Sequence, residues 1–213
     1  MNFKLSLAFF SIFFPLISGG IAAVESRPPL YFTQENLEAT ADRHSADKNW
    51  ETAAELYQKL IAKSPNTARY HYKYGGALAM VAQSGNKFKA LTLINDIRGA
   101  FEKTIEIEPS HIEARWALIE YYIQLPVIAG GSEEKAVSYA AQLANVSPVD
   151  GWLANGHIAE FYERYQSAEQ YYKKAIALGK SKTAYQKLAD LYKNKMAQPE
   201  KAAAVMKQFQ QAK

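Results

Sequence analysis

AAELYQKLIAKSPN (residues 53–66) has three approximate copies later in the chain, RGAFEKTIEIEPSH (98–111), AVSYAAQLANVSPV (136–149) and AEQYYKKAIALGKS (168–181). In the first three copies a residue at the same place, Tyr57, Phe101 or Ala140, stands eight positions before a proline. An internal repeat of this length is typical of a chain built from stacked structural units.

A second helical pattern precedes these copies. It combines a large residue with a small or branched neighbour and another large residue three or four positions on, as in Tyr74-Gly75 with Leu78, Leu118-Ile119 with Tyr122, and Leu188-Ala189 with Tyr192. Small residues let two helices approach closely, and large ones fill the space between pairs. The pattern therefore predicts paired helices, each pair ended by a proline that cannot continue the second helix.

The combined pattern resembles the tetratricopeptide repeat (TPR), and the resemblance covers about residues 33–211. It implies an all-α, right-handed superhelical solenoid of about five helix pairs, over a domain of residues 34–213. Single repeats depart from the family pattern at Thr40-Ala41, at Ile97 and at Lys180. The first helix of the fourth repeat looks short, and its register stays open.

Two intervals exceed the usual repeat length of about 34 residues. Pro65 to Pro109 is 44 residues and Pro109 to Pro148 is 39. The first excess predicts an elongated back helix in the second repeat, and the second falls in LPVIAGG (125–131). Both lie at the same end of the solenoid, so we expect Val127 and Ile128 to pack against the helix face that bears Phe88 and Leu91. The alternative is that Val127 and Ile128 stay exposed as an apolar docking loop.

The Gly-Gly pair at 130–131 raises the question of a phosphate loop. A helix precedes it, and neither nucleotide-binding glycine spacing is present. Ser132 followed by Glu133 and Glu134 is typical of a helix N-cap with acids in its first turn. The segment therefore predicts an elbow between two helices, and it is similar to a Gly-Gly-Ser turn of some exported bacterial TPR proteins.

The N-terminus has the features of a signal peptide. Lys4 precedes an apolar run at 5–17, and small residues follow, with cleavage expected after Ala22 or Ala23. The run of thirteen residues is shorter than the about 20 that span a bilayer. We expect a signal peptide at 1–23, a linker at 24–33, and export to the periplasm or secretion without stable membrane insertion. An uncleaved anchor is the alternative.

Charge divides the chain into two parts. Residues 24–172 carry 14 Lys and Arg against 19 acids, whereas residues 173–213 carry ten Lys against two acids. A solvated helical face is the simplest interpretation, and an anionic partner is the alternative. No Arg occurs in the basic part, so bidentate phosphate contacts are missing. We expect no nucleic acid partner.

Motifs for catalysis or cofactors are missing from the sequence. The chain has no cysteine and four histidines, which lie far apart. His157 and Glu160 could share a helix face, but a zinc site needs three or four ligands. No G-x-S-x-G nucleophile elbow occurs. We therefore expect no enzyme activity, no metal and no cofactor.

The resemblance implies binding of a protein or peptide in a concave groove lined by the front helix of each pair. Family positions that face the groove correspond here to Glu38, Asp42, Arg69, Tyr72, Glu113, Trp116, Glu120, Gln186 and Asp190. Chaperone-binding TPR domains use Lys and Asn at two places held here by Glu38 and Asp42. The groove thus favours a basic or mixed-charge segment, with Tyr72 and Trp116 as aromatic anchors. The alternative is a small-ligand-binding accessory protein of an envelope transporter, with those two rings lining an apolar cavity. The sequence leaves the oligomeric state open.

The signal peptide gives a first prediction. The exported protein should begin at Ala23 or Val24 and should be released from cells by osmotic shock. Intact-mass measurement of the released protein checks this, and retention of residues 1–22 in a membrane pellet would contradict it.

Overall fold

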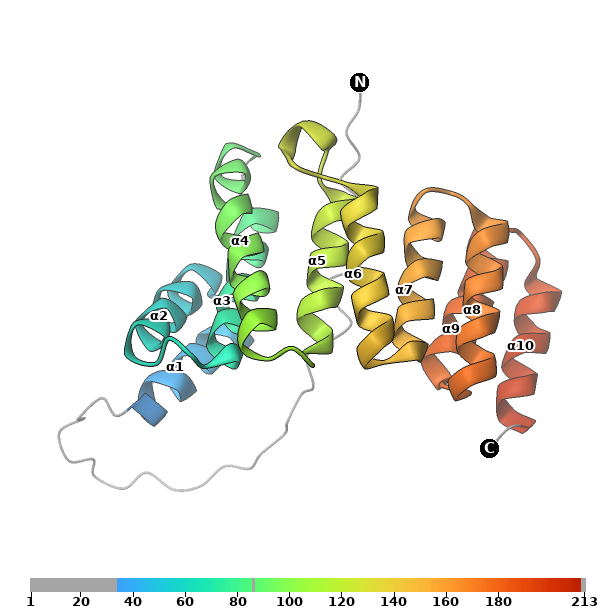
Figure 1. Cartoon of the computed structure of the whole chain (residues 1–213), viewed down its shortest axis with the longest axis horizontal. Coiled ribbons are helices and arrows are strands. Elements are labelled where there is room, and N and C mark those ends of the chain that lie inside the picture. The colour runs from blue at the N-terminus through green and yellow to red at the C-terminus, as the bar shows by residue number, and fades with distance from the viewer. Residues whose placement is uncertain (1–33, 86, 212–213) are drawn as a thin grey trace.

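The computed structural model describes residues 34–85 and 87–211, and within these ranges it consists of helices without strands (Figure 1). In chain order the helices are α1 (Gln34–Ala46), α2 (Trp50–Lys63), α3 (Ala68–Ser84), α4 (Lys87–Ile107), α5 (Ile112–Gln124), the 3-10 turn η1 (Val127–Ala129), α6 (Glu133–Val146), α7 (Pro148–Phe161), α8 (Tyr165–Gly179), α9 (Lys182–Asp190), the π turn η2 (Leu191–Lys195) and α10 (Pro199–Gln211). Within the described ranges, no helix combines the length and the apolar character that crossing a bilayer requires. The predicted signal peptide and linker lie outside these ranges.

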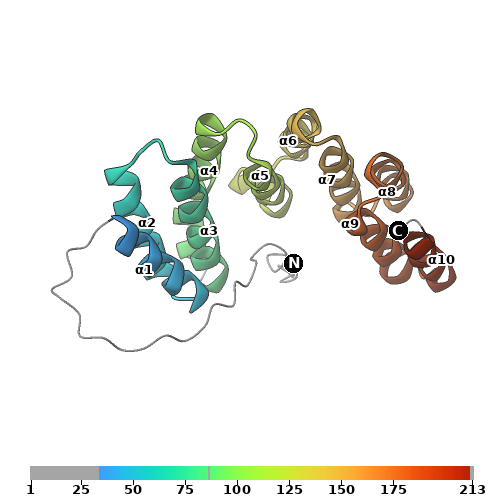
Figure 2. The same ribbon diagram turned by 90° about the horizontal axis from the view of Figure 1, so that it is seen from below.

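Successive helices form five antiparallel pairs arranged as an arch. Helices α1, α3, α5, α7 and α9 lie toward the inside of the arch and form the front layer, as Figure 2 shows. Their partners α2, α4, α6, α8 and α10 form the outer, or back, layer. The predicted all-α solenoid of five helix pairs is confirmed. So is the elongated back helix of the second pair, since α4 has 21 residues.

Front and back helices meet where a glycine faces an aromatic ring. A Cβ on Gly75 would lie 3.0 Å from Phe101 Cε1, and a Cβ on Gly156 would lie 2.4 Å from Tyr172 Cε1. Both rings are almost fully buried. Each glycine on a front helix therefore leaves a space, and the aromatic ring of the back helix fills it.

The third pair uses the opposite arrangement at the same two positions. Ile119 stands on the front helix where the second pair has Gly75, and Ala140 stands on the back helix where it has Phe101. Ile119 and Ala140 have no exposed surface. The large side chain thus comes from the front helix in this pair and from the back helix in its neighbours.

The first helix of the fourth repeat, which the sequence analysis expected to be short, has 14 residues. It begins immediately after Ser147, which ends α6 and also caps α7 by accepting a hydrogen bond from the backbone N–H of Asp150. Pro148 is well suited to the first position of a helix, because its fixed φ fits and its missing N–H has no partner there. The expectation was wrong because this proline starts a helix without any intervening turn.

The elbow between α5 and α6 has the predicted local structure. Ser132 accepts a hydrogen bond from the backbone N–H of Lys135, and Glu133 and Glu134 occupy the first turn of α6. Gly130 has φ +97, a left-handed conformation that favours glycine. A Cβ on Gly131 would lie 1.8 Å from the carbonyl oxygen of Leu125. Both glycines are therefore required to close the turn.

The predicted packing of this elbow against the start of α4 is wrong. Val127 is 86% exposed and Ile128 is 98% exposed, and Phe88 on α4 is 82% exposed. The two segments do lie at the same end of the arch (Figure 1). The elbow instead closes on its own helix pair, because the backbone N–H of Ser132 donates to the carbonyl of Tyr122.

The glycine–ring contact generates a second prediction. Gly156→Ala should lower the free energy of unfolding by about 1–3 kcal/mol, because the new methyl group overlaps the ring of Tyr172. The matched control is Gly76→Ala, whose Cβ would meet nothing within 4 Å inside α3. That change should stabilise the protein by about 0.5–1 kcal/mol, the ordinary preference of a helix for Ala over Gly. Urea unfolding followed by circular dichroism measures both, and equal effects of the two substitutions would contradict the interpretation.

Candidate functional site

The inner face of the arch is the candidate site, because the front helices carry all nine predicted groove residues. Glu38 and Asp42 lie on α1, Arg69 and Tyr72 on α3, three more on α5, and the last two on α9. The structure therefore places the predicted set on one layer of the solenoid, although it shows no partner in contact with any of them.

The acids of the first pair are neutralised within the protein. Arg69 Nη2 lies 2.5 Å from Glu38 Oε1, and Lys73 Nζ donates to Asp42 Oδ1 at 2.6 Å. The hydroxyl of Tyr57 on the back helix α2 also donates to Asp42 at 2.6 Å. Since each carboxylate already has a cationic partner, this end of the groove presents little net negative charge.

Tyr72 lies between two other rings. Its centroid is 5.8 Å from that of Phe101 and 4.8 Å from that of His111. Burial, together with a smaller contribution from the negative charge of Glu113, raises the pKa of Tyr72 to about 12. Glu113 itself has a side chain that is 48% exposed, and its Oε2 lies 3.2 Å from Nδ1 of His111. In this part of the groove Glu113 is therefore the accessible charge, and Tyr72 is mostly covered.

Trp116 joins the third pair to the fourth. Its Nε1 donates to Asp150 Oδ1 at 3.3 Å, and its ring centroid is 6.2 Å from that of His157. The described part of the chain has two buried hydrophobic clusters, one centred on the first three pairs and one on the last two, and Trp116 packs against both. Trp116 is thus a structural link between repeats, and its role as an aromatic anchor of the groove stays a prediction.

Glu120 is paired as well. Its Oε1 lies 2.5 Å from Nε2 of His157, and its side chain is only 18% exposed. Burial by itself raises the pKa of Glu120, but the hydrogen bond and charge of His157, helped by Gln124, outweigh burial and hold the pKa below its ordinary value. Glu120 is therefore ionised at neutral pH, with His157 beside it.

The last two predicted residues, Gln186 and Asp190, are exposed on α9. Glu113 is exposed as well. Glu38 and Asp42 each have an Arg or Lys partner, whereas these three predicted groove residues are exposed and have none among the ion pairs of the described residues. The inner face therefore exposes an acid in its middle part, Glu113, and mixed charges at its C-terminal part, where α9 carries Asp190 together with Lys182 and Lys187.

Sequence reasoning missed Asp150 and His157, both on α7, because it left the register of the fourth repeat open. A usable signal exists in the spacing of small residues. Twelve positions separate Ala41 from Ala53, and the same step separates Gly156 from Ala168. This match would have placed His157, directly after Gly156, at the position that Asp42 occupies directly after Ala41.

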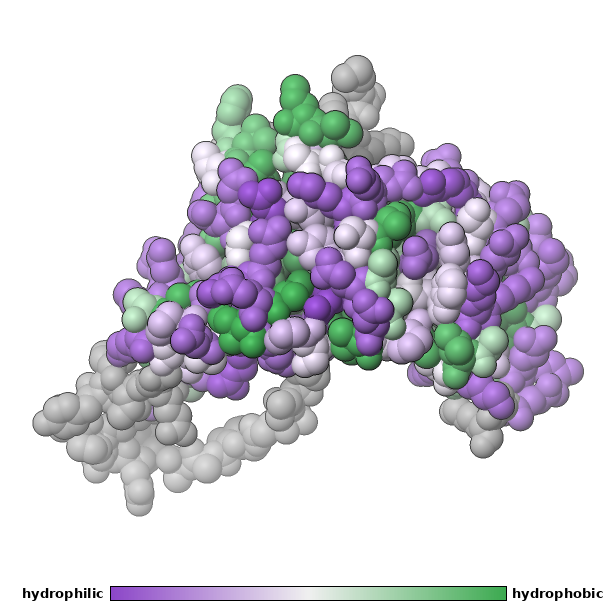
Figure 3. All heavy atoms as spheres, in the orientation of Figure 1, coloured by the Kyte–Doolittle hydropathy of each residue, from purple (hydrophilic) through white to green (hydrophobic). Residues whose placement is uncertain are grey.

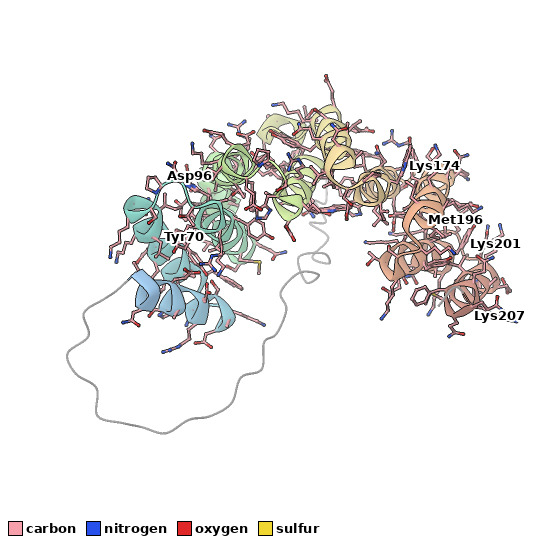
Figure 4. The ribbon with its side chains drawn as sticks, turned by 60° about the horizontal axis from the view of Figure 1, so that its bottom comes forward. Tyr70, Asp96, Lys174, Met196, Lys201 and Lys207 are labelled. Atoms are coloured by element: carbon pink, nitrogen blue, oxygen red, sulfur yellow. The ribbon has the colours of Figure 1, made fainter. Side chains whose placement is uncertain are left out.

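The lysines of the C-terminal region lie on both layers: Lys182 and Lys187 belong to the front helix α9, and others belong to the back helices. Lys174 on α8 and Lys201 and Lys207 on α10 gather at the C-terminal end of the arch (Figure 4). Lys174 Nζ lies 4.4 Å from the ring centroid of Trp152, and all three lysines are exposed. These three lysines therefore form a solvated basic surface on the back helices, while Lys187 on α9 lies close enough to the inner face to act on Glu120.

The alternative of a small-ligand cavity finds no support at the two predicted rings. Two hollows in the described part of the chain, one between α8, α9 and α10 and one between α2, α3 and α4, are not lined by Tyr72 or Trp116. Among residues 34–85 and 87–211, no three His, Asp or Glu side chains are grouped to hold a metal ion.

Comparison with known proteins supports the fold alone. No family model matches the sequence, and no curated protein matches it. Solved structures do match. TTC0263, a thermophilic TPR protein of Thermus thermophilus, is 18% identical with a TM-score of 0.59, and the match covers 83% of this chain and 90% of that one. A tetratricopeptide repeat protein from Parabacteroides merdae is 15% identical with a TM-score of 0.59, over 85% of this chain and 66% of that one. MamA from Desulfovibrio magneticus RS-1 is 14% identical with a TM-score of 0.54, over 84% and 93%.

The Glu120–His157 pair gives a prediction for the pH dependence of stability. Glu120 has a lower pKa in the folded protein than the ordinary value of 4.5. Its ionised form therefore stabilises the fold above pH 4.5, and this contribution disappears as the pH falls below that value. Glu120→Gln should be less stable than the unmodified protein at neutral pH and should lose less stability on acidification.

Thermal unfolding between about pH 7 and pH 3 measures this difference. Glu55→Gln, at an exposed position of α2, is the control, and it should follow the unmodified protein. Parallel loss of stability in the Glu120→Gln variant and the unmodified protein would show that the pair contributes nothing.

Proposed function

We propose that this chain, which has the fold of the tetratricopeptide-repeat proteins, is a non-catalytic scaffold that binds a protein or peptide segment along its inner face. The observation that carries the proposal is the distribution of exposed polar side chains on the front helices. Glu113, Gln186 and Asp190 are exposed there, while Glu38, Asp42 and Glu120 are held by cations or by His157.

The partner we propose is a basic or mixed-charge segment. Its positive groups would meet Glu113 and Asp190, which lie on front helices of the third and fifth pairs. Arg69, whose side chain is 60% exposed, offers a cation at the other end of the groove. Charges arranged in this way select the register of a bound segment more than they add affinity.

A non-catalytic role agrees with how the polar groups of the inner face are used. Glu120 and His157 are occupied by each other, Asp150 accepts from Trp116, and Glu160 accepts from Tyr172. These contacts hold neighbouring helices together. None of them leaves an activated nucleophile beside a free base, which acyl-transfer chemistry requires.

We propose that the scaffold works outside the cytoplasm, in the periplasm of a bacterial cell. The support for this is the apolar N-terminal run followed by small residues, and a chain without cysteine that suits an oxidising compartment.

Affinity capture from an envelope extract tests the proposal. The unmodified protein should retain one protein in a fixed ratio. Glu113→Lys/Asp190→Lys reverses the charge of two exposed acids on the front helices and should lose that protein while its circular dichroism remains helical. The expected loss of affinity is at least about tenfold, since repulsion replaces attraction at two positions.

The matched control reverses two charges on the outer layer. Glu55→Lys/Glu106→Lys makes the same change in net charge on α2 and α4, where both side chains are exposed. This variant should retain the partner. Equal loss in both variants would assign the effect to net charge, and equal capture by both would remove the inner face as the binding site.

A further inference from the structure

Exposed apolar side chains concentrate at one edge of the arch. Nine large hydrophobic side chains are exposed in the described part of the chain, and seven of them lie at the turns inside the helix pairs or within two helical turns after them. The other two, Val146 and Leu178, lie near the ends of back helices at the opposite edge. We call the edge formed by the turns inside the helix pairs the intra-repeat edge. Most of the exposed apolar side chains lie on it.

The two insertions form the most exposed parts of this edge. Ile128 and Val127 in the elbow are 98% and 86% exposed, and Phe88 in the first turn of α4 is 82% exposed. Figure 1 shows the elbow and the start of α4 projecting at the same end, and Figure 3 shows hydrophobic side chains covering both projections. Both departures from the regular repeat thus place apolar surface in the same direction.

Part of the polar backbone of the elbow is paired internally, within the turn that follows its tip. Residues 125–131, LPVIAGG, carry no polar atom in any side chain. The backbone N–H groups of Ala129 and Gly131 both donate to the carbonyl of Pro126, and the N–H of Gly130 donates to the carbonyl of Val127. Backbone groups that enter an apolar medium must be paired internally, because no water is present to replace a missing partner.

We propose that the intra-repeat edge docks reversibly on the surface of a lipid bilayer, with Val127, Ile128 and Phe88 entering the outer part of the acyl region. Almost complete exposure means that the two tip side chains of the elbow have hardly any neighbours. A protein partner would need a matching pocket for each projection, whereas a fluid bilayer accommodates any projecting apolar shape. The side chains of residues 125–131 also offer no hydrogen-bonding group for the polar contacts that accompany protein interfaces.

Neighbouring groups on the edge suit the membrane–water interface. Phe161 and Tyr162, both partly exposed, follow at the turn between α7 and α8, and Arg164 lies 5.3 Å from the ring centroid of Tyr162. Aromatic rings and long cationic side chains favour the headgroup level, where an apolar body and a polar end are both accommodated.

Charges around the edge nearly cancel, so the docking does not depend on anionic lipids. Arg164 is paired with Glu133, and Lys89 Nζ lies 2.9 Å from Glu51 Oε1. Apolar insertion should therefore occur on neutral vesicles and should change little with salt, unlike attraction between charged surfaces.

Flotation with vesicles of phosphatidylcholine tests the proposal. The unmodified exported protein, which is expected to begin at Ala23 or Val24, should float with the vesicles in low and high salt. Val127→Ser/Ile128→Ser should reduce the bound fraction at a given lipid concentration and weaken partitioning by at least about tenfold, because two branched side chains no longer leave water. Both side chains are exposed, so the thermal stability of this variant should not fall.

The matched control is Val146→Ser/Leu178→Ser, which removes two exposed apolar side chains from the opposite edge. It should float like the unmodified protein. Each variant is prepared in the exported form without the apolar segment at 5–17, so flotation reports on the folded part of the chain.

A local reporter follows the elbow itself. Because the chain has no cysteine, Ile128→Cys places a single thiol at the tip for an environment-sensitive dye. Vesicles should shift its emission to shorter wavelength. A dye at Leu178→Cys should show no such shift.

Three results would overturn the proposal. Equal flotation of the unmodified protein and Val127→Ser/Ile128→Ser would show that the edge does not contribute. Binding that requires phosphatidylglycerol and disappears in high salt would assign the contact to the lysines of α8 and α10. No flotation, together with a concentration-dependent dimer that Val127→Ser/Ile128→Ser abolishes, would assign the edge to a second copy of the chain.

Discussion

The close approach of a glycine on one helix to an aromatic ring on its partner sets the geometry of the arch. Gly156 leaves room for the ring of Tyr172, and Gly75 for that of Phe101. Each contact fixes how near the two helices of a pair lie and at what height they meet. A small residue also meets a large one in the third pair, where Ala140 and Ile119 exchange the two roles. Close approach within the pairs keeps the front helices in one layer, where Glu113 and Asp190 project from the third and fifth pairs.

Contacts between pairs have a different chemistry. Trp116 and Glu120 on α5 reach Asp150 and His157 on α7 through a hydrogen bond and an ion pair, so the junction between the two hydrophobic clusters is partly polar. Polar contacts of this kind depend on direction, and they hold the third and fourth pairs at a defined angle. The same side chains that shape the groove are thus also the ones that orient its two halves.

Local patterns were readable in the sequence, whereas contacts between repeats were not. The cap at Ser132 and the length of α4 depend on neighbouring residues and were predicted correctly. Topology predicted that the elbow and the start of α4 lie at the same end, but the direction of the elbow depends on a backbone hydrogen bond to Tyr122, which no pattern shows. The pairing of Glu120 with His157 was missed because it requires the register of two repeats at once.

The inverted sizes at Ile119 and Ala140 mean that the units of this solenoid are not interchangeable modules. A chimera that joined the front helix of the third pair to the back helix of the second would set Ile119 against Phe101 and overfill the space between the helices. The reverse exchange would set Gly75 against Ala140 and leave a void. Duplication or shuffling of repeats in this chain would therefore have to move whole helix pairs. A change of side-chain size at Ile119 or Ala140 would require a compensating change at the other position.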